Sequence, residues 1–484
     1  MPFRLTRRPL LACTLTTCLV AQPAGAVSSS LQLPNLGDAS SSLFSSQQEY
    51  QLGRAWLMAF RGQAPIISDP LLSDYLEHLV YKLATFSQLT DRRLELVVVD
   101  NKTLNAFAVP GGVVGVHNGM FLFAQSEDEL ASVLAHELAH LSQRHFARGM
   151  EQQKSSTIIN LATLLGALVI AATAGGDAGL AAITASQAAA LENQLRYSRQ
   201  NEAEADRVGM ITLIRAGLDP MSMATMFEQM QRASRYYGRP PEFLLTHPVT
   251  ERRIADARSR AARYARQQHP DDLEYRLMQA RVALHFEPNV NAAIKRFRSD
   301  LSADSEHPDA HRYGLVLALI KAVRLDEAQQ QLDELLKKDP ERITYLLAQG
   351  DIWLGQGKPE QARDMLARQL RFNPNNHPLT MAYFEALLRT GDKQAAEQLL
   401  TRHSRQRPSD PQLWYELAEV RGLTGDILGV HQARGEYFVL MGAPDHAIRQ
   451  LGYALQTPGI SRTDAAQIQQ RIEDIQAWKE ALDF

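Results

Sequence analysis

Two of the three histidines in residues 133–147, together with a glutamate, have a spacing that can bind a metal ion. His136, Glu137 and His140 fit the pattern H-E-x-x-H. Residues four apart on an α-helix are offset by about 40° and one turn, so both imidazoles project from one face. They can bind a single Zn²⁺, which takes a few nitrogen or oxygen ligands and keeps an open position for water. Glu137 can then remove a proton from that water as it attacks a peptide carbonyl.

The sequence around this pattern predicts that it lies on a helix. Ser126 and Glu129 fit the capping box S-x-x-E just ahead of an apolar run. Two histidines and a glutamate on a helix can also form an ordinary polar face, and a five-residue pattern can occur by chance. The agreement of helix start, metal ligands and core face favours a metal site, because apolar residues recur at helical spacing on the core face: Leu130, Val133, Leu134, Leu138 and Leu141.

A second charged segment, residues 193–215, is expected to form another helix that carries two acids four residues apart, Glu202 and Asp206. Two acids on a helix usually form a solvated face. Beside a metal site, Glu202 can supply a third ligand. Asp206 can hydrogen-bond a ligand imidazole and fix its tautomer.

The metzincin pattern offers a different third ligand. It requires a glycine three residues and a histidine six residues after His140, but Gln143 and Phe146 stand there. His145 is one residue out of register, and we interpret it as a polar neighbour of the site. A glutamate ligand is therefore favoured.

Two short apolar segments ahead of the H-E-x-x-H helix predict β-strands, residues 94–99 and residues 113–116, with a Pro-Gly-Gly turn before the second. A strand that leads towards a metal helix can offer its free edge to an extended peptide. The alternative is an edge strand that only provides a packing surface. We assign the substrate-binding edge to the second segment, formed by Val113, Val114, Gly115 and Val116.

The N-terminus and the composition restrict where the protein works. Residues 1–26 are typical of a secretory signal peptide, with three arginines, an apolar run and the cleavage site Ala24-Gly25-Ala26; residues 27–46 are expected to be a flexible leader. Both cysteines, Cys13 and Cys18, lie within the signal, so the mature chain has no disulfide.

A length of 484 residues predicts two or three domains. The net charge of -3 indicates no nucleic-acid partner.

Residues 157–190 form an apolar segment of a different kind. A first run of 17 residues, 158–174, is followed by a Gly-Gly-Asp turn and an alanine-rich run. Seventeen residues lie at the lower limit for crossing a membrane. We expect a helical hairpin that packs over the metal site or contacts a membrane or a partner. A plain buried hairpin is the alternative.

Residues 273–484 contain an internal repeat. Four classes of position share a period of 34 residues, which is typical of tetratricopeptide repeats. This pattern predicts an all-α solenoid whose concave face binds extended segments or partners. The repeated positions are Pro340, Pro374 and Pro408; Gly357, Gly391 and Gly425; Ala328, Ala362 and Ala396; and Leu332, Leu366 and Leu400.

With these motifs together, the chain resembles the HtpX-type zinc metallopeptidases, and more closely their periplasmic BepA-like members with C-terminal tetratricopeptide repeats. The segments NAFAVPGG, HELAH, EAEAD and THPVTERR occur in the expected order ahead of the repeats. The resemblance covers nearly all of the mature chain. It implies an α+β, zincin-like (gluzincin) metallopeptidase domain at residues 47–268, followed by the tetratricopeptide-repeat domain at 273–484.

The resemblance also implies roles for individual residues and for partners. One Zn²⁺ per chain is expected, with Glu137 as catalytic base and Asp206 as a supporting acid. His247, in a Pro-rich loop, matches a histidine that occupies the open zinc position and keeps the enzyme latent. The zinc ligands are expected to be His136, His140 and Glu202.

Members of this group are expected to work in the periplasm. There they would degrade misassembled outer-membrane β-barrel proteins, promote maturation of a lipopolysaccharide-transport barrel, and dock on the β-barrel assembly machinery through their repeats. A second hypothesis is a mainly non-proteolytic chaperone or assembly factor, in which the repeats and the apolar hairpin do most of the work and the zinc site is usually closed.

Overall fold

The computed structural model describes residues 45–152, 199–237, 241–266, 273–302 and 306–482. The predicted signal peptide, nearly all of the predicted leader, the predicted apolar hairpin 157–190 and the junction between the two predicted domains lie outside these residues. In the part of the chain that is described, no helix is both long and apolar enough to cross a membrane.

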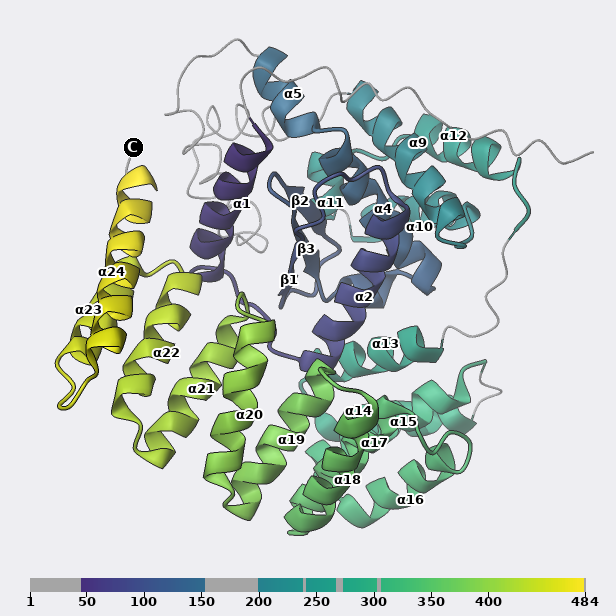
Figure 1. Ribbon diagram of the computed structural model, residues 1–484. Helices are drawn as coiled ribbons and strands as arrows, with labels where there is room; N and C mark the ends of the chain where they lie inside the picture. Colours follow the sequence, from purple (N-terminus) through teal and green to yellow (C-terminus); the bar gives the residue numbers. More distant parts are fainter. Residues whose placement is uncertain (1–44, 153–198, 238–240, 267–272, 303–305, 483–484) are drawn as a thin grey trace, which may run out of the picture. The chain divides into compact units, whose positions relative to one another are not determined.

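A small three-stranded sheet lies beside the H-E-x-x-H helix in the N-terminal part of the chain (Figure 1). Its strands are β1 (Glu95–Val99), β2 (Ala106–Val109) and β3 (Val113–His117), in the order β1-β3-β2. β1 runs parallel to β3, and β2 runs antiparallel to it. The helices of this part are α1 (Ser46–Arg61), α2 (Pro70–Phe86), α3 (Met120–Phe123), α4 (Glu127–Ser142), α5 (His145–Gln152), α9 (Arg199–Arg215), α10 (Met221–Tyr237), α11 (Glu242–Thr246) and α12 (Glu251–Ala261).

The position of β3 contradicts the predicted substrate-binding edge. Val113, Val114, Gly115 and Val116 pair with β1 on one side and with β2 on the other, and all four are buried. The prediction of a free edge there is wrong, because the preceding segment, residues 106–109, also forms a strand and folds back over the Pro-Gly-Gly turn. Gly111 and Gly112 adopt φ of +81° and +82° in this turn, a conformation that favours glycine.

Among the residues that the structure describes, β2 forms the free edge on this side of the sheet. The N–H of His117 donates to the carbonyl of Asn105 at 3.0 Å, so residues 105, 107 and 109 direct their backbone groups towards β3. The N–H and C=O groups of Ala106 and Ala108 therefore face away from β3. They form the outer edge of β2.

The helix α4 begins where the sequence predicts. The Ser126 hydroxyl accepts the N–H of Glu129, and the Glu129 carboxylate accepts the N–H of Gln125 at 2.6 Å. This carboxylate also accepts hydrogen bonds from Thr225 and Gln229 of α10, so one buried acid joins the start of α4 to a neighbouring helix. Of the predicted core face, Leu130, Val133, Leu134 and Leu138 are buried and Leu141 is partly buried.

The C-terminal part consists of helices that pair in sequence. They are α13 (Leu273–His285), α14 (Val290–Ser302), α15 (Pro308–Lys321), α16 (Leu325–Leu336), α17 (Ile343–Gly355), α18 (Pro359–Phe372), α19 (His377–Thr390), α20 (Lys393–Gln406), α21 (Pro411–Thr424), α22 (Ile427–Leu440), α23 (Pro444–Leu455) and α24 (Arg462–Leu482).

The 34-residue period has a direct structural meaning in these helices. The repeated alanines and leucines lie on the second helix of each pair and are fully buried, at 0% exposure. The repeated glycines lie in the turn between the paired helices with φ between +72° and +83°. Each pair thus hides its small side chains against a neighbour and turns at a residue that tolerates the left-handed conformation.

The buried histidine at the end of β3 makes stability depend on pH. Burial lowers the pKa of His117 to about 4, from an ordinary value of 6.5. Between these two pH values the unfolded chain binds a proton that the folded chain does not, so stability is lost as pH falls from 6.5 to 4. At about 1.4 kcal/mol per pH unit, the expected loss is about 3 kcal/mol.

A His117→Gln variant should show a smaller loss, because glutamine does not titrate. Urea unfolding at pH 7 and pH 4 measures the free energy of unfolding of both proteins. The wild-type protein should lose about 3 kcal/mol more than the variant on acidification. Equal losses would show that His117 is not buried in its neutral form.

Candidate metal site

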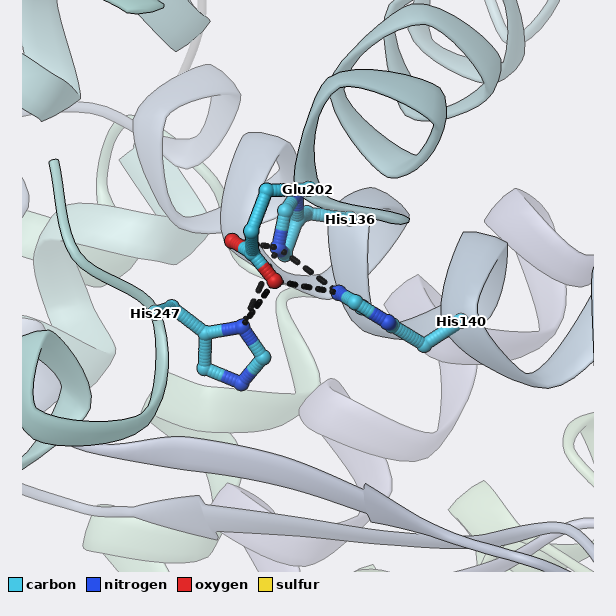
Figure 2. Close-up of side chains that lie close together, drawn as sticks. All are labelled: His136, His140, Glu202 and His247. Atoms are coloured by element: carbon cyan, nitrogen blue, oxygen red, sulfur yellow. Dashed lines mark hydrogen bonds and ion pairs between the residues drawn. The ribbon is translucent and has the colours of Figure 1, made fainter. Parts of the chain in front are cut away.

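Four side chains that are far apart in the sequence converge on one point, as Figure 2 shows. His136 and His140 come from α4, Glu202 from the first turn of α9, and His247 from the residue that follows α11. Each offers one donor atom, and these atoms all lie within 4.8 Å of one another. All four residues are buried.

The donor atoms point at each other, as Figure 2 shows. Nε2 of His136 and Nε2 of His140 are 3.0 Å apart, and the Glu202 carboxylate lies 3.5 Å and 3.4 Å from them. Nδ1 of His247 lies 3.1 Å from Glu202 and 3.4 Å from Nε2 of His136. Three imidazoles and one carboxylate are a donor set that suits a divalent transition metal such as zinc, so these residues fit the predicted ion.

The electrostatics of Glu202 agree with a role as ligand. Burial alone would raise the pKa of its carboxyl group, but His247, His136 and His140 hold that pKa well below the ordinary value. The carboxylate is therefore ionised at neutral pH and ready to bind a cation.

Glu137 lies beside the cluster with an unused acceptor. Its Oε1 is buried and has no hydrogen-bond partner among the residues that the structure describes; Nε2 of His247 is 3.6 Å away. Burial raises the pKa of the Glu137 carboxyl group, while His247, His136 and the backbone N–H of Ala108 act in the opposite direction. Ala108 lies on the outer edge of β2, so its N–H faces the Glu137 carboxyl group and this edge adjoins the acid.

A pair of charged residues supports His136 from behind. Oδ1 of Asp206 lies 3.0 Å from Nδ1 of His136, the nitrogen that faces away from the cluster. Arg253 of α12 binds Asp206 through two hydrogen bonds of 2.8 Å and 2.7 Å, and its Nη1 lies 2.8 Å from Glu202. Burial raises the pKa of Asp206, but Arg253 and His136 outweigh it and keep the residue ionised. Sequence reasoning missed Arg253, although it closes the quoted segment THPVTERR.

A second group of charged residues lies behind His140. Nδ1 of His145 is 2.8 Å from Nδ1 of His140, and Nε2 of His145 is 3.1 Å from Glu204. Arg148 donates to the same Glu204 oxygen at 2.9 Å. The interpretation of His145 as a polar neighbour agrees with this position, but its link to Glu204 was not predicted. Glu204, the middle acid of the segment EAEAD, was the residue in the sequence that could have suggested this link.

The short helix α11 holds His247 in the cluster. The ring of Phe243, which is fully buried, stacks on the His247 ring at 4.8 Å, and the N–H of His247 donates to the Phe243 carbonyl at 2.8 Å. The N–H of Phe243 reaches the carbonyl of Leu104 at 3.4 Å, and Asn105 donates to Glu242 at 3.4 Å. The histidine is thus anchored to the residues that lead directly into β2.

The structure brings together the four predicted metal-binding side chains and places Glu137 and Asp206 against them. Val113, Val114, Gly115 and Val116 do not line this space with a free edge, and Ala106 and Ala108 take that position instead. The chemical roles of these residues remain predictions.

The close approach of α9 to α4 depends on Gly209. A Cβ atom at this position would lie 3.0 Å from the carbonyl oxygen of Ala135 and 3.1 Å from the N atom of His136, and both are backbone atoms. Gly209→Ala is therefore expected to push α9 away by a few tenths of an ångström, destabilise the fold by about 1–3 kcal/mol and weaken metal binding.

Metal content and urea unfolding test this prediction. Gly452→Ala is a matched control, since a Cβ there meets nothing within 4 Å. A Gly209→Ala protein that keeps both its metal and its stability would show that a methyl group fits between α9 and α4 without displacing either helix.

Comparison with known proteins agrees with this geometry. Residues 70–261 match the model of peptidase family M48, and residues 313–377 and 354–419 match models of the tetratricopeptide repeat. These matches confirm the predicted fold class, a metallopeptidase domain followed by helical repeats.

Several relatives match most of the chain. A Vibrio cholerae protein is 37% identical over 354 residues, which cover 73% of this chain and 72% of the relative. The beta-barrel assembly-enhancing protease of Escherichia coli K12 is 36% identical over 379 residues, 77% of each chain. A Yersinia pestis protein of that name is 33% identical over 361 residues, 73% of this chain and 74% of its own. The chain therefore belongs to peptidase family M48 and is a metallopeptidase whose catalytic domain is followed by tetratricopeptide repeats.

Proposed function

We propose that this metallopeptidase is a zinc-dependent endopeptidase whose site is held closed by His247. The observation that carries the proposal is the buried cluster of three imidazoles and one carboxylate, with the free oxygen of Glu137 beside it. His136, His140 and Glu202 would hold one zinc ion per chain. When bound, the ion would polarise the scissile carbonyl and lower the pKa of a water molecule.

The chain's own residues would perform the remaining steps. Glu137 would accept the proton of the attacking water and return it to the leaving amine, as a general base and then a general acid. Asp206, itself fixed by Arg253, would hold the His136 ring in one orientation. The free edge of β2 would bind the substrate backbone as an added strand through Ala106 and Ala108, in place of the residues predicted from the sequence.

Latency would follow from the position of His247. Its ring lies among the other three donors and 3.6 Å from Glu137, so it takes the space that a substrate and its water would need. An endopeptidase that shares its compartment with unfolded proteins benefits from such a restraint. Opening the site would require α11 to leave the carbonyl of Leu104.

The names of the relatives suggest the biological setting. We infer a periplasmic protein that acts in outer-membrane quality control. It would degrade misassembled β-barrel proteins and assist the assembly of a lipopolysaccharide-transport barrel. The repeats would dock on the β-barrel assembly machinery, since helical repeats bind extended segments and partner proteins. The apolar segment 157–190 remains a proposed contact with a membrane or a partner.

The closed site also favours a second function. A chaperone or assembly factor that rarely cleaves would use the repeats and the apolar hairpin and would keep His247 in place. The two activities can coexist in one chain, and the catalytic residue Glu137 separates them experimentally.

Zinc content and casein cleavage of purified residues 27–484 test the proposed function directly. One zinc ion per chain is expected, together with weak cleavage that stops when a chelator removes the ion and returns when zinc is added back. A protein that binds no zinc, or that cleaves equally well after chelation, would refute the zinc mechanism.

A further inference from the structure

We propose that His145 and Glu204 are positioning residues that orient the metal-binding imidazole of His140. Nδ1 of His145 lies 2.8 Å from Nδ1 of His140, on the side of the ring opposite to the cluster. His145 is buried, with 1% of its surface exposed. This inference rests on the proposed zinc site, because His145 and Glu204 would orient His140, one of the proposed zinc ligands.

The hydrogen bonds run in one direction only. When Nε2 of His140 binds a metal, its Nδ1 keeps its proton and must donate, so Nδ1 of His145 is the acceptor. The remaining proton of His145 is then on Nε2, which donates to Glu204 at 3.1 Å. Arg148 binds the same carboxylate oxygen at 2.9 Å. The chain of contacts thus ends on an ion pair, and it fixes the tautomer of both histidines.

The backbone supplies independent support for this arrangement. Glu204 is two residues from Glu202, about 200° around α9, and cannot reach the cluster on the same face. His145 reaches Glu204 because the chain turns sharply between α4 and α5 at Arg144, which adopts a φ of +50°. A left-handed arginine is strained and persists only where its surroundings hold it. The Glu49 carboxylate holds the Arg144 side chain: its Oε1 lies 3.2 Å from Nη2 of Arg144, and its Oε2 accepts a hydrogen bond from Nε at 3.3 Å.

Each of the two imidazoles thus has its own polar contacts on the side away from the cluster. His136 contacts Asp206, which Arg253 binds. His140 contacts His145, which is linked to Glu204 and Arg148. All three acids of EAEAD therefore serve the site: Glu202 as ligand, and Glu204 and Asp206 as orienting groups behind different imidazoles. An ordinary buried polar network would stabilise the fold without favouring the metal-bound orientation of His140.

Zinc affinity of the full mature chain distinguishes these two roles. The dissociation constant for Zn²⁺ is measured by competition with a chromophoric chelator, beside the urea stability of the zinc-free protein. His145→Phe keeps a ring and removes both nitrogens, and it is expected to weaken zinc binding about 10- to 100-fold. His145→Asn places its Oδ1 where Nδ1 was and should recover most of this loss. Glu204→Gln should weaken binding several-fold.

His78→Phe is the control, because the His78 side chain is 75% exposed and contacts Asp74, four residues away, rather than the site. It should leave zinc affinity unchanged. Wild-type affinity in His145→Phe would overturn the inference, as would equal weakness of the Phe and Asn variants. A wild-type protein without zinc affinity would instead refute the proposed function. The two failures are thus distinct.

Discussion

Replacing Glu137 with glutamine is expected to lower peptide cleavage by about 10²- to 10⁴-fold while leaving zinc bound. The amide keeps the size of the side chain but cannot accept the proton of the attacking water. The zinc ligands are other residues, so the metal content should stay at one ion per chain. Casein cleavage and zinc content, measured on the same preparation, test both halves of the prediction.

Glu127→Gln is a suitable control, because Glu127 lies in the first turn of the same helix and bonds Tyr75 rather than the cluster. Cleavage by Glu137→Gln at the wild-type rate would remove Glu137 from the mechanism. The same variant separates the two proposed functions in cells. Full rescue of envelope integrity by Glu137→Gln would favour the chaperone, whereas failure to rescue would favour the peptidase.

Replacing His247 with alanine is expected to raise basal proteolysis about tenfold or more. The imidazole lies 3.1 Å from Glu202 and 3.4 Å from His136, so its removal opens one side of the cluster. If the open state of the wild-type protein is populated at about 1–10%, a variant that is always open gains about 10- to 100-fold in activity. The initial rate of casein cleavage at a fixed zinc content measures the gain.

Leu245→Ala controls for general loosening of α11, because Leu245 lies on the same short helix with 42% of its surface exposed. Its activity should equal that of the wild-type protein. Unchanged or reduced proteolysis in His247→Ala would mean that the histidine supports the site instead of closing it.

Local spacing predicted much of this molecule. H-E-x-x-H places its histidines on one face because the helix period is a local property, and Ser126 begins that helix as the capping pattern requires. The 34-residue period predicted the helical repeats, because each repeat is also a local unit of sequence. The fold around these elements follows from apolar positions that recur at helical spacing.

Properties that depend on pairing between distant segments were beyond sequence reasoning. The edge of the sheet was assigned to β3 because residues 106–109 were not recognised as a strand; once β2 forms, it covers that edge. Arg253 and Glu204 were missed because each reaches its partner across more than 40 residues. His145 reaches Glu204 only through a left-handed arginine, which no local pattern announces.

If β2 binds substrate as proposed, the hydrogen bond from Phe243 to Leu104 has a consequence for which polypeptides can open the site. Successive outward-facing groups along β2 and its approach belong to residues 104, 106 and 108, and the N–H of Phe243 already occupies the first of them. A short peptide on Ala106 and Ala108 leaves that contact intact. A longer extended chain must compete with Phe243 for the carbonyl of Leu104, and by winning it would lift α11 and His247 together. The contact between Phe243 and Leu104 would then make the site selective for substrate length. Long unfolded chains would open it, and short fragments would not.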